Sequence, residues 1–543
     1  MLFKKDDKQT DRIHGVIAAG GPETVDAGMA MLKQGGNAVD AAVAAAFASF
    51  IAEIGVVHLG GSGIAHIYDP HDGRSVVYDF FSNTPGLGLD EGVKKEMDFR
   101  QITVDFGETT QDFHLGRAAV AVPGNIAGLC LMAEEHGRLP LSTLLRPAIE
   151  MARDGIAIAG FQANTCELLT PLYTNTEGMR EIFLRNGRMI RAGERLYIPD
   201  LAETLLQLAE HGASLVRDGS LAKAFVADQA ANNGLLTAED LDHYQVKKLP
   251  SIHLQYREFE ILLPPRSSTG GVLTAFTMKL LAQFSPGQLK HGSAAHLRLL
   301  YEVMAATSRA RPYWDKRDES MPVGEAIQQF LDDAFVCRYV GEIRDALNSQ
   351  RASLAAVEQK GAANTSHLSV IDGTGMTVSL TTTAGESAGY VVPGTGFIPN
   401  NMMGEEDLHP LGFHSRPAGR RIPTMMTPTI VLYNKQPRVV VGSGGSVRIR
   451  SAIMQVLSNL LDFHMGLDKA VNNARVHIED GVLQCEAGYD AQAVAELETM
   501  GYPVNRWQTR SIYFGGAHSV SRTVDGRLFG AGDSRRGGAT AVN

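Results

Sequence analysis

The stretch Asn364-Thr365-Ser366-His367-Leu368-Ser369-Val370-Ile371-Asp372 decides how the rest of this 543-residue chain is interpreted. It follows a polar segment, residues 358–364, and opens a strand-like alternation that continues to Thr383. A threonine hydroxyl is a weak nucleophile at neutral pH and needs an adjacent base. A threonine at a chain N-terminus supplies that base itself, because its α-amine titrates at about 7.7–8.0. We therefore expect the chain to cut itself between Asn364 and Thr365, and Thr365 to act as the nucleophile.

The window alone also fits an ordinary half-exposed strand in which Thr365 has no chemical role. Motifs elsewhere in the chain favour the first interpretation. They are Gly35-Gly36-Asn37-Ala38-Val39-Asp40-Ala41-Ala42, Val122-Pro123-Gly124, Ala152-Arg153-Asp154-Gly155, Leu236-Thr237-Ala238-Glu239-Asp240-Leu241, Pro264-Pro265-Arg266-Ser267-Ser268-Thr269-Gly270-Gly271, Asn400-Asn401-Met402-Met403, Gly442-Ser443-Gly444-Gly445 and Gly532-Asp533-Ser534-Arg535-Arg536. In this order, and with the Thr365 motif, they resemble the γ-glutamyltransferase family of N-terminal nucleophile hydrolases over nearly the whole chain.

The resemblance implies a fold and a set of roles. The fold is α+β, a four-layer αββα sandwich, with a largely helical large (α) subunit of residues 1–364 and a small (β) subunit of residues 365–543. Thr383 falls where the family keeps a hydroxyl beside the nucleophile's amine. Gly445 and Ser446 fall where backbone N–H groups stabilise the oxyanion, a contact whose loss costs about 10²–10³ in rate. Ser446 replaces the family's usual second glycine, which a backbone donor tolerates.

Hydrophobic patterns predict the elements that surround these motifs. Helices are expected at 23–34 and 38–53, followed by strands within 60–81. The middle of the chain, 125–345, reads as mostly helical, with breaks at Pro140, Pro147, Pro250 and Pro264-Pro265. From 365 onward strands dominate, at 366–383, 429–433, 439–441 and 511–520, with one helix at 451–464.

Composition excludes several classes of protein. The net charge of −10 and the absence of a basic run argue against a nucleic-acid partner. Four widely spaced cysteines favour neither a disulfide framework nor a zinc site, and no metal or organic cofactor is expected. Residues 1–12 lack the apolar core of a secretory signal, and the apolar stretch 40–53 is too short to span a bilayer. A cytoplasmic enzyme that does not bind membranes is the expectation.

Two other motifs suggest different chemistry. Gly385-Glu386-Ser387-Ala388-Gly389 matches the nucleophile elbow of serine hydrolases and follows a strand, but the residues after it cannot begin the helix that an elbow requires. Gly442-Ser443-Gly444-Gly445-Ser446 resembles a phosphate-binding loop but lacks its Lys-Ser/Thr pair. Both alternatives are weaker than the N-terminal nucleophile interpretation.

The positions that would hold a γ-glutamyl head group depart from the family pattern. In glutathione-handling members an arginine follows the pair that corresponds to Asp79-Phe80, and here Phe81 stands there. Gly385 stands at a position where those members have an asparagine. After the Asn-Asn pair, Met402 and Glu405 replace the Gln and Asp of those members. Thr424 and Met425 replace their pair of serines. Loss of one charge-assisted contact costs about 1.5–3 kcal/mol, so several losses together should abolish recognition of that group. Four arginines remain as candidate anion holders, Arg416, Arg420, Arg421 and Arg448, although a solvated surface position is expected for each.

The chain thus resembles the acylase and amidohydrolase branch of the family. We expect an autoprocessed amidohydrolase that forms an acyl-threonine intermediate on a small-molecule amide, with both subunits staying associated as a heterodimer that can dimerise further. One alternative is true γ-glutamyl transfer or glutathione hydrolysis. The alternative outside enzymes is an uncleaved, non-catalytic binding homologue.

Overall fold

The structure, a computed structural model, describes residues 14–89, 96–105, 110–317, 321–349, 351–353, 364–409 and 411–543. The expectations for residues 1–12 and for the polar segment 358–363 lie outside these ranges. No helix within the described ranges combines the length and apolarity needed to cross a membrane.

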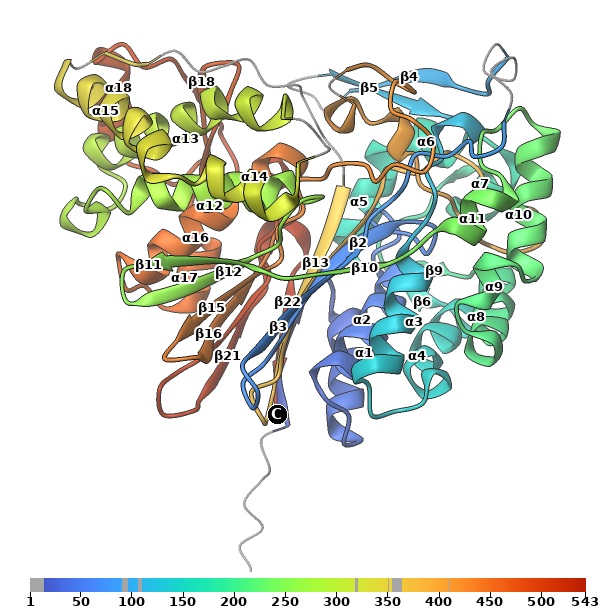
Figure 1. The fold of residues 1–543 in the computed structure, drawn as a ribbon. Helices are drawn as coiled ribbons and strands as arrows, with labels where there is room; N and C mark the ends of the chain where they lie inside the picture. Colours follow the sequence, from blue (N-terminus) through green and yellow to red (C-terminus); the bar gives the residue numbers. More distant parts are fainter. Residues whose placement is uncertain are drawn as a thin grey trace, which may run out of the picture.

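Two antiparallel sheets form the centre of the molecule (Figure 1). The first has seven strands in the order β10 (Lys247–Leu249), β3 (Arg74–Phe80), β2 (Ser62–Asp69), β14 (Thr377–Gly385), β13 (Asn364–Asp372), β1 (Gly15–Ala19) and β22 (Ala539–Val542). The second has six, in the order β11 (Ile252–Tyr256), β12 (Phe259–Leu263), β15 (Thr429–Tyr433), β16 (Gln436–Val441), β20 (Ser519–Arg522) and β21 (Leu528–Ala531).

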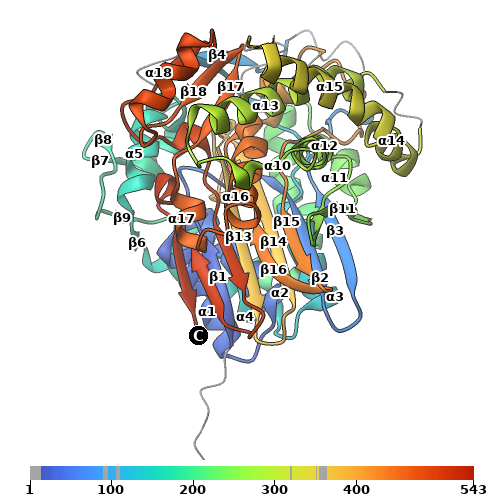
Figure 2. The same cartoon turned by 90° about the vertical axis from the view of Figure 1, so that its left-hand side faces the viewer.

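The two sheets pack face to face through buried apolar side chains that both contribute. These include Val16, Tyr68 and Ile371 from the first sheet and Leu262 and Val440 from the second. Figure 2 shows the orange and red strands of the second sheet lying against the blue and yellow strands of the first. Strands that are buried on both faces read as continuous apolar runs, as Val439-Val440-Val441 does.

Helices cover the two outer faces and complete the four layers. Against the first sheet lie α1 (Pro22–Lys33), α2 (Ala38–Ala52) and α3 (Asn125–His136), with α4 (Leu141–Asp154) packed on α2. Against the second lies α12 (Thr269–Leu281) with α16 (Ile449–Leu461) beside it, and α13 (Ala294–Asp315) and α15 (Asp333–Ser349) pack on α12. Every residue of α2 is buried, which explains its alanine-rich sequence. Its N-terminus is fixed by a capping box between Asn37 and Asp40.

The remaining elements surround this sandwich. Their bounds are β4 (Arg100–Asp105), β5 (Thr110–Leu115), β6 (Ile156–Ala157), β7 (Leu184–Arg185), β8 (Arg188–Met189), β9 (Arg195–Leu196), β17 (Val476–Glu479), β18 (Val482–Cys485) and β19 (Val504–Arg506), with helices α5 (Gly160–Leu168), α6 (Thr170–Tyr173), α7 (Glu177–Phe183), α8 (Pro199–His211), α9 (Ser214–Arg217), α10 (Ser220–Ala231), α11 (Ala238–His243), α14 (Val323–Phe330), α17 (Leu467–Asn472) and α18 (Ala491–Thr499). Short 3₁₀ turns join several of them.

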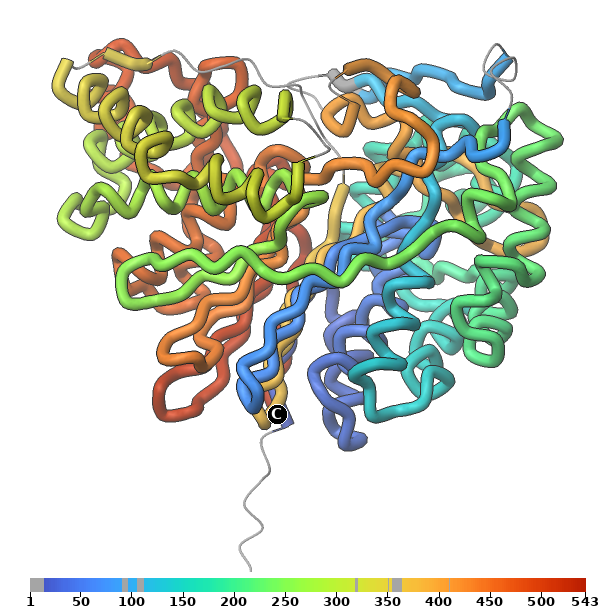
Figure 3. The backbone as a smooth tube through the Cα atoms, in the orientation of Figure 1, coloured from blue at the N-terminus to red at the C-terminus, as the bar shows by residue number. Residues whose placement is uncertain are grey.

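The predicted α+β sandwich is confirmed, with local corrections. Pro147 does not break a helix but lies inside α4, whose buried face (Leu144, Leu145, Ala148) outweighs the lost hydrogen bond. The middle of the chain also contains β10, β11 and β12, and Figure 3 shows this green segment crossing from one sheet to the other. The strand predicted at 511–520 is a 3₁₀ turn, Ile512–Phe514, followed by β20.

Strands from the two sides of the Asn364–Thr365 bond alternate within the sheets. In the first sheet β14 and β13 lie between β2 and β1, and β22 pairs with the outer edge of β1. In the second sheet β12 pairs with β15. A break after Asn364 therefore leaves both pieces hydrogen-bonded to one another throughout the core.

Candidate active site

The Asn364–Thr365 bond lies at the start of β13, in the middle of the first sheet (Figure 1). Both residues are buried. Asn364 pairs with Gly385, whereas Ser366 pairs with Thr382, so two residues of β14, Thr383 and Ala384, oppose the single residue Thr365. A β-bulge of this kind changes the direction in which side chains point, and such bulges are frequent beside active sites.

The bulge places the Thr383 side chain against the bond. Its hydroxyl donates a hydrogen bond to the carbonyl oxygen of Asn364 at 2.6 Å. The same oxygen atom, Oγ1, accepts the Gly385 N–H at 3.1 Å. Thr383 therefore contacts the carbonyl group of the predicted cleavage site directly.

The glycine-rich turn after β16 approaches β13 so closely that side chains are excluded. A Cβ atom on Gly444 would lie 2.0 Å from the carbonyl oxygen of Thr365. Gly445 and Ser446 both have positive φ angles, +115° and +50°. Neither of their N–H groups has a backbone acceptor within the part of the chain that the structure describes. Both N–H groups therefore remain available in the turn that carries Ser446 to the pocket, as the motif predicts for anion stabilisation.

The late motif Gly532-Asp533-Ser534-Arg535-Arg536 packs behind the same bond. Arg536 Nη1 donates to the Thr365 carbonyl oxygen at 3.3 Å. Arg535 forms a bidentate ion pair with Glu486, at 2.6 and 2.7 Å, and both are buried. Burial alone would raise the pKa of Asp533, but Arg475 and Arg535 hold it well below its ordinary value. The motif therefore supplies a rigid charged support for the start of β13.

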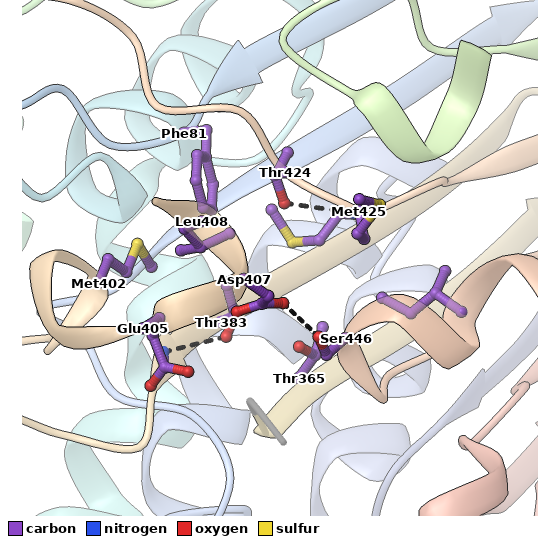
Figure 4. A pocket seen from close by; sticks show the side chains of 13 residues that line it. Phe81, Thr365, Thr383, Met402, Glu405, Asp407, Leu408, Thr424, Met425 and Ser446 are labelled. Atoms are coloured by element: carbon purple, nitrogen blue, oxygen red, sulfur yellow. Dashed lines mark hydrogen bonds between the residues drawn. The ribbon is translucent and has the colours of Figure 1, made fainter. Parts of the chain in front are cut away.

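A pocket opens onto Thr365 (Figure 4). Nearly all the predicted site residues line it, together with some that were not predicted. The lining residues are Phe81, Thr365, Thr383, Gly385, Met402, Glu405, Asp407, Leu408, Thr424, Met425, Met426, Ser446 and Ile449. Gly445 is not among them and contributes through the turn that carries Ser446. The structure therefore brings the predicted nucleophile, hydroxyl partner and substrate wall into one cavity.

Two acids line this pocket, Glu405 and Asp407, and one of them contacts Ser446. The Ser446 hydroxyl donates to Asp407 Oδ2. Glu405 Oε1 and Asp407 Oδ1 are buried and have no hydrogen-bond partner among the described residues. Burial raises the pKa of both carboxyl groups, and the negative charge of Asp407 raises that of Glu405 further. Glu405 therefore tends to keep its proton and to act as a hydrogen-bond donor as well as an acceptor.

The opposite wall of the pocket is apolar. Phe81 is fully buried and packs with Ile64, Met402, Met403 and Met426. Its N–H donates to Asp79 Oδ1 at 3.0 Å, which fixes the backbone at this position. A wall of aromatic and thioether groups provides no charge for a carboxylate.

None of the four candidate arginines belongs to the residues lining this pocket. The expectation of solvated positions is wrong for two of them. Arg421 is buried beside Asp79, with its Nε 3.7 Å from Oδ1, and donates to the Tyr244 hydroxyl at 2.9 Å. Arg448 is buried over the Tyr513 ring, at 4.8 Å. Both guanidinium groups therefore contact other groups inside the fold and do not line the pocket.

The Gly-x-Ser-x-Gly sequence is no serine-hydrolase elbow. Ser387 is buried with φ at +121°, and its Oγ accepts the N–H of Gly389 at 3.0 Å. Residues 387–401 contain neither helix nor strand. The helix that an elbow requires is therefore missing from this described stretch, as the sequence predicts.

Sequence reasoning missed several pocket residues. Asp407 lies two positions after Glu405, and its acidic character next to a recognised motif was the available signal. Leu408, Met426 and Ile449 carry no signal in the sequence, because ordinary apolar residues become pocket walls only through folding. Glu386 was noticed only within the rejected Gly-x-Ser-x-Gly motif.

Comparisons with known proteins identify the family of the chain. The family described as gamma-glutamyltranspeptidase matches residues 24–543. The chain is 31% identical to the acylase ACY 1 proenzyme of Pseudomonas sp. (strain V22), covering 97% of this chain and 93% of that protein. It is 26% identical to the glutathione hydrolase proenzyme of Escherichia coli (strain K12), covering 96% and 90%.

A solved structure shows the same fold. The cephalosporin acylase from Bacillus halodurans superposes with a TM-score of 0.83 at 23% identity, covering 100% of this chain and 99% of that one. The predicted resemblance is therefore confirmed. The chain belongs to the γ-glutamyltranspeptidase family, and it is an enzyme of that family.

Proposed function

We propose that the chain cuts itself between Asn364 and Thr365 and that the new N-terminal Thr365 hydrolyses an amide bond in a small molecule. The observation that carries this proposal is the single pocket that contains Thr365, Thr383 and Ser446. Residues 1–364 and 365–543 would then be the large and small subunits of a heterodimer. No step requires a metal or an organic cofactor.

The reaction follows from the groups around Thr365. Its Oγ attacks the substrate carbonyl carbon while its α-amine takes the hydroxyl proton, and the Gly445 and Ser446 N–H groups stabilise the oxyanion. The C–N bond breaks as the amine passes its proton to the leaving nitrogen, which leaves an acyl-threonine. Water, activated by the same amine, then releases the acid and restores Thr365. An amine in place of water would give acyl transfer.

The pocket walls indicate which acyl group fits. Phe81 and Met402 offer no cation for a carboxylate, whereas Glu405 and Asp407 each present an unpaired oxygen to hydrogen-bond donors. The substrate is therefore an amide whose acyl group is largely apolar, carries a hydrogen-bond donor and lacks the α-carboxylate of a γ-glutamyl group.

A panel of chromogenic anilides tests this specificity. We expect slow release from the γ-glutamyl anilide and faster release from anilides of uncharged acyl groups or acyl groups with an amino substituent. The expected advantage is about tenfold or more, since a missing charge-assisted contact costs at least that factor. Efficient turnover of the γ-glutamyl anilide at micromolar concentration would instead indicate true γ-glutamyl transfer or glutathione hydrolysis.

Denaturing electrophoresis separates this proposal from a non-catalytic binding homologue. The enzyme should run as two bands of about 39 and 19 kDa, in proportion to the parts of the 58.5 kDa chain on each side of the bond. Thr365→Ala should give one full-length band and no turnover. Cleavage of that variant at the same bond would contradict the assignment of Thr365.

A further inference from the structure

Glu386 is a buried carboxyl group that the amide hydrolysis described above does not use. It follows β14 directly and is only 2% exposed. Both of its oxygen atoms contact Asn364, the residue before the proposed cleavage bond. Oε1 accepts the Asn364 backbone N–H at 2.9 Å, and Oε2 accepts the side-chain Nδ2 at 2.8 Å.

Asn364 is thereby held at three points. Glu386 binds its N–H and its carboxamide, and the Thr383 hydroxyl binds its carbonyl oxygen at 2.6 Å. Glu386 is itself fixed, because its backbone N–H donates to Asn401 Oδ1 at 2.7 Å. The buried carboxylate therefore fixes the Asn364 N–H and side chain, and Thr383 fixes the carbonyl oxygen of the following peptide, so Asn364 cannot turn as a whole without breaking these contacts.

We propose that Glu386 is a positioning residue for self-cleavage, which orients the Asn364 carbonyl for attack by Thr365. This inference rests on the proposed function, because it concerns the same bond. In the first step the Thr365 Oγ–C bond forms, the C–N bond breaks and the hydroxyl proton moves to the new amine. Water then hydrolyses the resulting ester and leaves a carboxylate on Asn364. A carbonyl group that is held in place is more often in the geometry that attack by the Thr365 hydroxyl requires, which raises the cleavage rate.

Exchanging the hydrogen-bonding groups of Glu386 and Asn364 tests this positioning role. Glu386→Gln keeps the shape but presents an N–H group to one of the two Asn364 donors, and Asn364→Asp places two carboxylates face to face. Each should slow cleavage by about tenfold or more. In the double variant the new amide at 386 accepts the backbone N–H and donates to the new carboxylate at 364. We expect its cleavage rate to recover to within a few-fold of the wild-type rate.

The rates are measured on full-length precursor made by cell-free translation, followed by denaturing electrophoresis. Glu302→Gln is the matched control, since Glu302 is an equally buried carboxylate on α13 that accepts from Tyr502 at 2.7 Å, far along the chain from the site. It should cleave like the wild type. A wild-type rate in Glu386→Gln, or a double variant no faster than the slower single variant, would overturn the positioning role of Glu386. Cleavage of Thr365→Ala at this bond would instead overturn the proposed function.

Discussion

In the proposed reaction, Thr365 supplies the nucleophile and, after cleavage, its base. The Thr383 hydroxyl contacts the carbonyl before it, and Arg536 contacts the carbonyl after it. The sequence could predict Thr365 and Thr383, because hydroxyl residues at these positions form part of recognisable motifs. It could not predict that Glu386 contacts Asn364, because that contact depends on the β14 bulge and on the turn that follows it.

Self-cleavage should become faster as the pH rises towards and beyond 8. Burial raises the pKa of Glu386 to about 8, although its two Asn364 donors lower it in part. Below that pH the carboxyl group is mostly protonated, and one oxygen then carries a hydrogen that faces a donor of Asn364. The rate should rise about tenfold per pH unit below the pKa and level off above it.

The single variant Glu386→Gln provides the control for this pH profile, because it adds no titratable group at position 364. Its group at 386 does not titrate, so the rise near pH 8 should disappear. The neighbours that also act on Glu386 are unchanged in that variant; they are Arg536, Arg448, Glu405, Tyr173 and His58. A profile that is the same in both proteins would assign the pH dependence to one of those neighbours.

At the scale of elements, the site is made where strand ends and turns meet. β13 supplies Thr365, β14 supplies Thr383, and the turn after β16 supplies Gly445 and Ser446. Strongly patterned elements such as α2 and β15 were predictable from periodicity. Strands β10 to β12 were not, because short strands inside a mostly helical region form only through pairing with partners that are distant in sequence.

Gly444→Ala should lower turnover by about 100-fold, because the new methyl group would lie 2.0 Å from the Thr365 carbonyl oxygen and displace the oxyanion turn. Gly466→Ala is the matched control, since no atom lies within 4 Å of its new Cβ position. Steady-state rates on the best anilide, with thermal unfolding as a check of folding, measure the effect. Equal rates in the two variants would show that the turn does not stabilise the oxyanion.

At the scale of the whole molecule, the αββα sandwich explains how a chain can be cut at a bond in the middle of a sheet and remain folded. The first sheet alternates strands from both sides of the bond, and the two sheets share a buried apolar layer. The resemblance to a family predicted this architecture, whereas composition and periodicity alone could not distinguish it from separate helical and β domains.

The two pieces should stay together after cleavage. Because β13 and β14 lie between strands of the large piece, separation would break hydrogen bonds along three strand pairs of the first sheet, β2 with β14, β1 with β13 and β1 with β22. We expect co-elution in size-exclusion chromatography under native conditions and separation only in denaturant. Elution of a free small fragment without denaturant would contradict this arrangement.

The most direct test of the central claim is intact-mass and N-terminal analysis of purified, active protein. The account predicts two polypeptides, the smaller of which begins at Thr365. An active preparation that contains only the uncut 58.5 kDa chain, or a small fragment that begins at another residue, would contradict it.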